Sequence, residues 1–144
     1  MNDVPTGFEP LFRNSPYTDT IGPIYYRKDG SDLVLGIRAL QKHANARGLV
    51  HGGLLMTIAD IALGYAMAFR EDPPASLITA NISADFAGSA KVGDWIEVHV
   101  DVQKSGSRLA FANAYLIAND QRILRASGVY LRAGALGSSG PTAT

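Results

Sequence analysis

One apolar segment, residues 52–69, constrains the fold of this chain more than any other part of its sequence. It contains no proline, and as a helix it presents apolar side chains on every face. Pro73 and Pro74 follow it and cannot continue a helix. At 1.5 Å per residue this helix is about 27 Å long. A helix that is apolar all around has to be covered on all sides, so the rest of the chain is expected to wrap around it.

The longer apolar stretch that includes this segment, residues 48–69, is long enough to cross a membrane, which is the alternative interpretation. It contains His51, Thr57 and Asp60. A carboxylate near the middle of a bilayer costs about 2.5 kcal/mol or more. Because alternating segments typical of a soluble sheet follow, we expect a buried core helix and no membrane association.

Strand patterns lie on both sides of this helix. Residues 24–28 and 32–40 flank Asp29 and Gly30, a dipeptide typical of hairpins. Four segments with two-residue periodicity follow the prolines: residues 78–86, 96–103, 109–118 and 123–131. In the first of them, Ile82 and Ala84 belong to the apolar set and Thr79 to the polar set. The alternation therefore predicts one buried face, with Thr79 on the other face.

The predicted element order is ββαββββ, an α+β fold. Short connections favour antiparallel neighbours, so we expect a curved antiparallel sheet around one long helix. The domain is predicted to span residues 22–133. Residues 1–21 form an N-terminal segment with a short helix expected over 7–15, and the Gly/Ser/Thr/Ala-rich residues 134–144 are predicted to be a flexible tail.

Composition excludes several kinds of partner. The 144 residues include 13 basic and 13 acidic side chains, so no net positive charge is available to bind nucleic acid. The absence of cysteine rules out thiolate metal sites and cysteine nucleophiles, and three scattered histidines favour no metal and no cofactor. The first residues contain no apolar run typical of a signal peptide, so a cytoplasmic location is expected.

Two features of the central segment could carry chemistry. Asp60 places a carboxylate in an apolar helix, where it needs a hydrogen-bonding partner or a cleft. The His51-Gly52-Gly53 sequence exposes backbone N–H groups at the positive end of the helix dipole, which suits an oxyanion, and the Asn45 side chain could donate nearby. Each feature has a structural alternative: Asp60 could merely accept hydrogen bonds, the glycines could form a tight turn, and Asn45 could stabilise its own loop.

Distance constrains these features jointly. Asp60 follows Gly52 by eight residues, about 12 Å along one helix, so one chain cannot bring both groups to a single carbonyl. If both groups act on one substrate, Gly52 of one subunit meets Asp60 of another. A two-fold dimer with two equivalent shared sites satisfies this requirement.

The combination of motifs resembles the hotdog-fold acyl-CoA thioesterases, in particular their phenylacetyl-CoA thioesterase-like branch. The resemblance is carried by residues 43–53, with Asn45 and His51-Gly52-Gly53, and by Asp60 nine residues after His51. Thr79-Ala80-Asn81 and Val92-Gly93-Asp94 extend it, and the overall pattern runs from about residue 22 to residue 131. It implies hydrolysis of an acyl-CoA to the free acid and coenzyme A by a homodimer with shared sites, associating further into a dimer of dimers.

The resemblance also implies a role for each site residue. Asp60 would be the general base or nucleophile, and the Gly52 N–H would bind the thioester oxygen. Asn45 would orient the carbonyl or the water, Thr79 would position the water, and His51 would support the turn or polarise the carbonyl. Gly53 is assigned to substrate binding with them.

Substrate and function leave alternatives open. The acyl group is expected to be small or medium, and an aromatic one is compatible, because Tyr65, Met67 and Phe69 could line a pocket or simply fill the core. Lys104 and Arg108 flank a turn and could contact the phosphates of coenzyme A. A hotdog-fold acyl-thioester dehydratase and a non-catalytic acyl-CoA-binding module are the competing functions.

Overall fold

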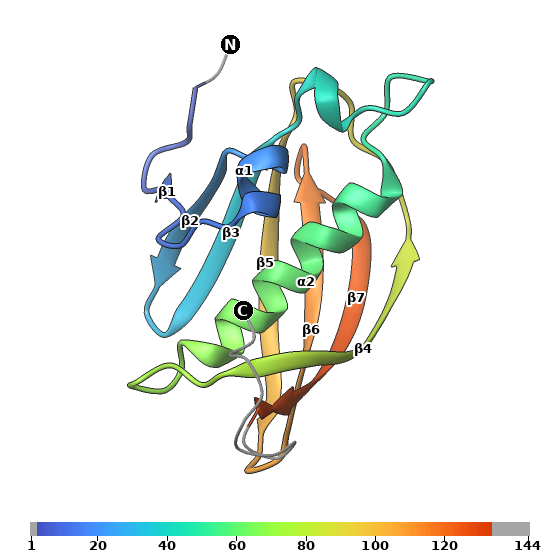
Figure 1. The fold of residues 1–144 in the computed structure, drawn as a ribbon. Coiled ribbons are helices and arrows are strands. Elements are labelled where there is room, and N and C mark those ends of the chain that lie inside the picture. Colours follow the sequence, from blue (N-terminus) through green and yellow to red (C-terminus); the bar gives the residue numbers. More distant parts are fainter. Residues whose placement is uncertain (1–2, 134–144) are drawn as a thin grey trace.

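The apolar segment forms the long helix α2 (Gly52–Ala68), and a seven-stranded antiparallel sheet curves around it (Figure 1). This computed structural model describes residues 3–133. The predicted α+β arrangement of one sheet around one central helix is confirmed. Among residues 3–133, no helix has the length and apolar character needed to span a membrane.

The sheet has the strand order β1-β2-β3-β5-β6-β7-β4, so β4 lies at one edge. Its strands are β1 (Glu9–Pro10), β2 (Ile24–Asp29), β3 (Asp32–Arg38), β4 (Leu77–Phe86), β5 (Trp95–Ser105), β6 (Leu109–Ala118) and β7 (Gln121–Arg132). Two short helices, α1 (Pro16–Ile21) and the 3-10 helix η1 (Gln41–His43), complete the elements. The predicted hairpin joins β2 and β3, and Gly30 at its turn has a positive φ of 62°.

The core lies between α2 and the inner face of the sheet. Ile58, Ala62 and Leu63 of the helix are fully buried there against Leu35, Ile96 and Leu116 of the strands. Alanines on β6 and β7 let the helix approach the sheet closely. The opposite side of α2, with Leu54, Thr57 and Ile61, is only half-buried, so the expected cover on all sides of the helix is incomplete in one chain.

The N-terminal segment differs from the prediction. The expected helix over residues 7–15 is wrong, and α1 instead begins at Pro16. Proline at the first helical position loses no hydrogen bond, and Ser15 caps the helix by accepting from the Thr18 N–H. Residues 3–15 extend along the fold, where β1 pairs with β2 and Phe8 packs edge-on against Trp95.

A bulge in β4 overturns the predicted orientation of Thr79. The register against β7 shifts between Thr79 and Asn81, so Ala80 is an extra residue. Thr79 consequently pairs with the buried Tyr130 and faces α2, the same side as Ile82. Simple alternation would have placed Thr79 on the outer face, because one inserted residue reverses every side chain beyond it.

The predicted flexible tail over residues 134–144 lies outside the described residues.

Candidate active site

The start of α2 presents one free backbone donor. His51 is the N-cap, and its Nδ1 accepts from the Gly53 N–H at 3.0 Å. The Gly52 N–H makes no hydrogen bond within residues 3–133. Of the two glycines predicted at the site, Gly52 therefore offers a donor at the positive end of the helix dipole, whereas the Gly53 donor is already engaged.

An exposed aromatic ring lies beside Gly52. Phe86, the last residue of β4, has 52% of its surface exposed. A Cβ atom on Gly52 would lie 3.3 Å from the Phe86 ring, so the ring and the helix start are in close contact. Phe86 was not predicted as a site residue. Because Phe86 is the last residue of an edge strand, its ring is not packed into the core.

Asn45 is divided between two tasks. Its Oδ1 accepts from the Arg47 N–H at 2.8 Å and from the Leu49 N–H at 3.2 Å, which shapes the loop before α2. Gly48 completes that turn with a positive φ of 80°. The Asn45 amide Nδ2 makes none of the hydrogen bonds found among residues 3–133. The side chain thus combines the loop role with a donor that is free for a substrate.

Asp60 is half-buried and held by two hydroxyl groups. Thr79 donates to its Oδ1 at 2.8 Å, and Tyr130 donates to the same atom at 2.6 Å. The Tyr130 hydroxyl also lies 3.0 Å from the Asp60 carbonyl oxygen. Oδ2 makes no hydrogen bond within the described part of the chain. The Asp60 carboxylate is therefore fixed at one oxygen and free at the other.

Tyr130 was not predicted as a site residue. It is 2% exposed, and its place in the alternation of β7 marks it as a core residue. Burial, followed by the hydrogen bond to the Asp60 carboxylate and its charge, raises the pKa of the Tyr130 phenol well above its usual range. The same strand contains Gly128, and a glycine inside a strand indicates that another group packs closely against the backbone there. This glycine is the one sequence signal for the unusual packing around Tyr130.

Asp60 lines a cleft of about 210 Å³ between α2 and the N-terminal segment. Tyr17 of α1 bridges the two sides, because its hydroxyl lies 3.1 Å from the Thr57 hydroxyl. Ile61 and Tyr65 continue the helix wall beyond Asp60, and residues 13–15 and Thr18 form the opposite wall. No site role was predicted for the N-terminal segment, but in the structure it forms one side of the cleft that contains the carboxylate.

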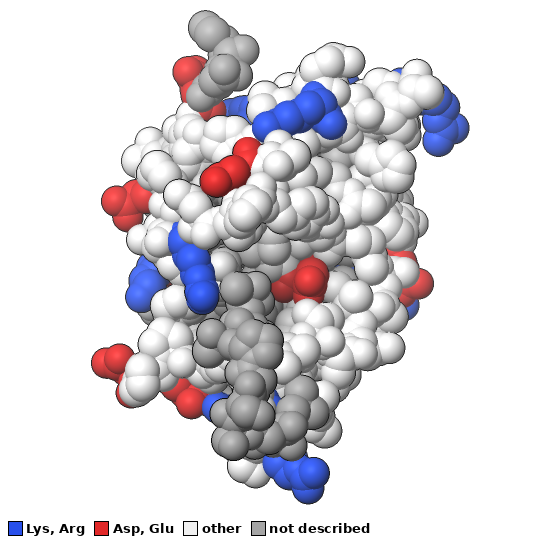
Figure 2. All heavy atoms as spheres, viewed as in Figure 1, with Lys and Arg blue, Asp and Glu red and all other residues white. Residues whose placement is uncertain are grey.

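The three large side chains near the end of α2 lie in different surroundings. Tyr65 reaches the cleft, Met67 is 1% exposed in the core, and Phe69 packs against Phe12 with ring centroids 4.7 Å apart. Figure 2 shows a small acidic patch near the middle of the view, with mostly uncharged atoms around it where the surface is not covered by grey atoms.

One chain does not bring all predicted site residues together. Gly52 and Asn45 lie at the start of α2, and Asp60 lies about 12 Å further along the helix. Lys104 and Arg108 flank the turn between β5 and β6, at the other end of the sheet from the start of α2 (Figure 1). The Arg108 carbonyl accepts there from the Arg132 N–H at 3.0 Å.

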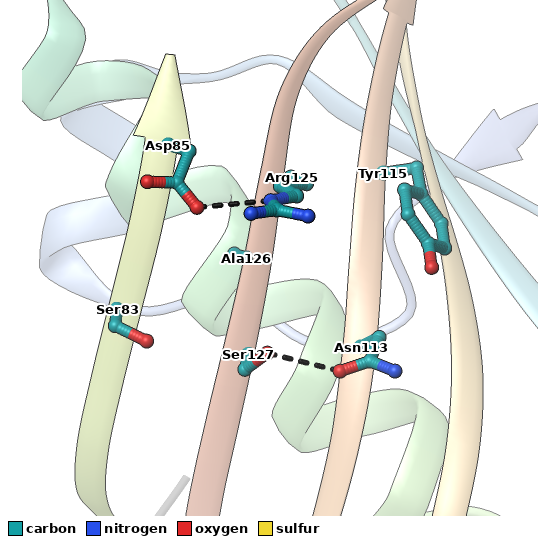
Figure 3. A pocket seen from close by; sticks show the side chains of 7 residues that line it. All are labelled: Ser83, Asp85, Asn113, Tyr115, Arg125, Ala126 and Ser127. Atoms are coloured by element: carbon teal, nitrogen blue, oxygen red, sulfur yellow. Dashed lines mark hydrogen bonds and ion pairs between the residues drawn. The ribbon is translucent and has the colours of Figure 1, made fainter.

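A second, polar groove of about 340 Å³ lies on the outer face of the sheet, across β4, β6 and β7 (Figure 3). Its polar groups bind one another: Arg125 donates to Asp85 at 2.9 Å, and Ser127 donates to Asn113 at 2.9 Å. The residues described include no group of three or more side chains suited to bind a metal ion. Asp60 and its cleft, on the opposite face, are the stronger candidate.

Comparison with known proteins places these features in a family context. Residues 47–124 match the model of the Thioesterase superfamily, and this range contains Gly52, Asp60 and Thr79. A Pseudomonas aeruginosa protein that carries the name putative esterase is 50% identical over 131 residues, 90% of this chain and 98% of that protein. Acyl-coenzyme A thioesterase 13 of Mus musculus is 31% identical over 85 residues, 58% of this chain and 59% of the mouse protein.

A solved structure shares the whole architecture. The PaaI protein from the phenylacetic acid degradation operon of E. coli superposes with a TM-score of 0.76 at 20% sequence identity. The match covers 91% of this chain and 89% of the E. coli chain. At this identity the similarity establishes the fold, and the roles of individual residues must be argued from the site itself.

Proposed function

The chain belongs to the thioesterase superfamily and is a thioester hydrolase with the hotdog fold, and from that premise we propose that it hydrolyses small or medium acyl-CoA substrates. The observation that carries the proposal is the Asp60 carboxylate, which is fixed at Oδ1, has no partner at Oδ2 among residues 3–133, and lies in a cleft of about 210 Å³.

In the proposed reaction, Asp60 acts on the thioester carbonyl carbon in one of two ways. As a general base, Oδ2 takes a proton from a water molecule whose oxygen attacks that carbon. As a nucleophile, Oδ2 attacks the carbon itself and forms an anhydride that water then hydrolyses. In both cases the C–S bond breaks, and coenzyme A leaves as a thiolate that takes up a proton. The products are the free acid and coenzyme A.

The Gly52 N–H and the Asn45 amide are the proposed oxyanion donors. Both are free of hydrogen bonds within residues 3–133, and the Gly52 N–H lies at the positive end of α2. Such donors stabilise the negative charge that develops on the carbonyl oxygen. His51 supports them by capping the helix, and Thr79 holds Asp60.

The proposed site is shared between subunits, because about 12 Å along α2 separates these donors from Asp60 of the same chain. The edge strand β4 supports a dimer: among residues 3–133 it pairs only with β7, so its other edge offers unpaired backbone groups. In a two-fold dimer each donor set would face the partner's carboxylate. A dimer of dimers remains the proposed full assembly.

The cleft supports a small or medium acyl group, including an aromatic one. Tyr17, Ile61 and Tyr65 supply apolar and aromatic surface next to Asp60. Lys104 and Arg108 are the proposed contacts for the phosphates of coenzyme A, and the partner subunit would have to bring them near the thioester.

Thiol release from a panel of acyl-CoA substrates tests the proposal. Acetyl-, hexanoyl-, phenylacetyl- and palmitoyl-CoA are incubated with the enzyme and a thiol-reactive dye, with Asp60→Asn as the control. We expect release for small and medium acyl groups in the wild type alone. Loss of water from a 3-hydroxyacyl-CoA without thiol release would identify a dehydratase, and binding without turnover would identify a binding module.

A further inference from the structure

Tyr130 brings a buried phenol to the proposed catalytic carboxylate. Its ring lies between α2 and the sheet with 2% of its surface exposed, and its hydroxyl reaches Oδ1 of Asp60 at 2.6 Å. A buried hydroxyl needs a partner, but any acceptor in the core would satisfy that need. The partner found here is the one carboxylate on α2.

The position of the two donors on Asp60 has a chemical consequence. Thr79 from β4 and Tyr130 from β7 both donate to Oδ1, so two adjacent strands hold the same oxygen atom. A carboxylate held in this way cannot exchange its two oxygens by rotation without breaking both hydrogen bonds. Oδ2 has no hydrogen-bond partner within residues 3–133, and Asp60 lines the cleft.

We propose that Tyr130 is a positioning residue that, together with Thr79, fixes Oδ1 of Asp60 so that Oδ2 is the atom that acts on the thioester. The proposal rests on the function proposed above, because it assigns a role within the same reaction. Tyr130 itself touches neither the substrate nor the water. It acts through Asp60 by fixing the orientation of the carboxylate.

Gly128 makes room for the Tyr130 ring. A Cβ atom on Gly128 would lie 2.7 Å from Cε1 of Tyr130 and 2.9 Å from Cδ1 of Leu63, closer than atoms can pack. Glycine inside a strand weakens the strand. In β7, the missing side chain at Gly128 leaves the space that the Tyr130 ring occupies, and the hydroxyl of this ring reaches Asp60.

The protonation state of Tyr130 fits a permanent donor. Burial and the Asp60 carboxylate raise the pKa of the phenol, so it keeps its proton at neutral and moderately alkaline pH. The other titratable groups at this cleft are Arg13 and Tyr17 from the N-terminal segment and Tyr65 from α2. None of them donates a hydrogen bond to Asp60 within the described residues.

The first test is Tyr130→Phe, which keeps the ring and removes only the hydroxyl. We expect kcat to fall about tenfold, the effect of a hydrogen bond of about 1.4 kcal/mol, with KM changed less than twofold. Tyr115→Phe is the matched control, since Tyr115 lies on the outer face of the sheet, and its kcat and KM should equal those of the wild type.

A second readout does not depend on activity. In protein labelled with ¹³C at the aspartate carboxyl carbons, the Asp60 signal is assigned by its absence in Asp60→Asn. At neutral pH its chemical shift should differ between Tyr130→Phe and the wild type, because Oδ1 loses a hydrogen bond, and it should be unchanged in Tyr115→Phe. Gly128→Ala, which displaces the ring but keeps the hydroxyl, should change this chemical shift as well, and it replaces Tyr130→Phe if that variant does not fold.

The outcomes separate the two proposals. If the wild type releases no thiol from any acyl-CoA, the proposed function fails, and the ¹³C chemical shift of Asp60 still decides whether Tyr130 holds its carboxylate. If the wild type is active but Tyr130→Phe keeps the wild-type kcat or the wild-type chemical shift of Asp60, Tyr130 only fills space in the core and the inference is overturned.

Discussion

The Thr79 hydroxyl lies 2.8 Å from Oδ1 of Asp60 and joins the edge strand β4 to the middle of α2. This contact depends on the bulge at Ala80, because a regular strand would turn Thr79 to the outer face. One irregular residue in β4 therefore determines whether the carboxylate has this donor. Because β4 is also the edge strand proposed to pair with a second subunit, the contact between Thr79 and Asp60 lies close to the proposed dimer interface.

Asp60→Asn should abolish acyl-CoA hydrolysis and leave the fold intact. The asparagine Oδ1 can still accept from Thr79 and Tyr130, so the surroundings keep their hydrogen bonds. The base or nucleophile is lost, because an amide nitrogen cannot take a proton from water or attack the carbonyl. Turnover is measured by thiol release and folding by circular dichroism. Activity within about threefold of the wild type, less than 1 kcal/mol of barrier, would contradict the assignment.

Two substitutions separate the tasks of Asn45. Asn45→Asp keeps the oxygen that accepts from Arg47 and Leu49 but removes the Nδ2 donor. We expect it to fold like the wild type and to lose roughly 10- to 1000-fold in kcat, the range for one oxyanion donor. Asn45→Ala should lose as much activity and also loosen the loop. A fully active Asn45→Asp enzyme would leave Asn45 with only its role in the loop.

Much of this architecture could be predicted from periodicity. The bounds of α2 follow from an apolar segment that ends before two prolines, and the strands from alternating residues between turns. Asp60 and Gly52 were identifiable as candidates because a carboxylate in an apolar helix and a glycine pair at a helix start are each unusual.

The parts that could not be predicted depend on tertiary contacts. The bulge at Ala80 leaves no trace in the local alternation, so the orientation of Thr79 was predicted wrongly. Tyr130 has the pattern of an ordinary core residue, and only its hydroxyl partner distinguishes it. Helix α1 has six residues, too few to show a helical period, so its place on the cleft could be found only in the structure.

The Tyr17 ring should limit the size of the acyl group. Tyr17→Ala removes one wall of the cleft beside Asp60, so we expect kcat/KM for hexanoyl- or octanoyl-CoA to rise several-fold relative to acetyl-CoA. Tyr17→Phe is the matched control: it loses the hydrogen bond to Thr57 but keeps the ring, and should keep the wild-type ratio. Equal ratios in all three proteins would show that the acyl group does not occupy this cleft.

His43 should make the stability of the fold depend on pH. Burial lowers its pKa, and its Nδ1 accepts from the Leu40 N–H at 2.9 Å while Nε2 lies 2.6 Å from the Ile21 carbonyl. The unfolded state therefore binds a proton at higher pH than the folded state. Stability should be complete above about pH 6.5, the unfolded value, and should fall as the pH drops below it.

Thermal unfolding at pH 7.5 and pH 5.5 measures this dependence. The wild type should lose stability between the two values, by no more than about 1.4 kcal/mol per pH unit for one proton. His43→Gln should be less stable at pH 7.5 but should show a smaller loss on acidification. An unchanged slope in His43→Gln would assign the pH dependence to other groups.

Complementation between two inactive variants tests the shared site. About 12 Å along α2 separates Asp60 from the Gly52 donor, so a site that uses both requires two subunits. When Asp60→Asn and Asn45→Ala chains are refolded together, a mixed dimer has one site with all native groups and one site with both defects. Random association places about half of the chains in mixed dimers, each with one of two sites intact, so about a quarter of the wild-type activity should return.

Subunit exchange is verified by mass spectrometry with one variant isotopically labelled. If exchange is complete and the mixture gives only the mean activity of the separate variants, each site lies within one chain.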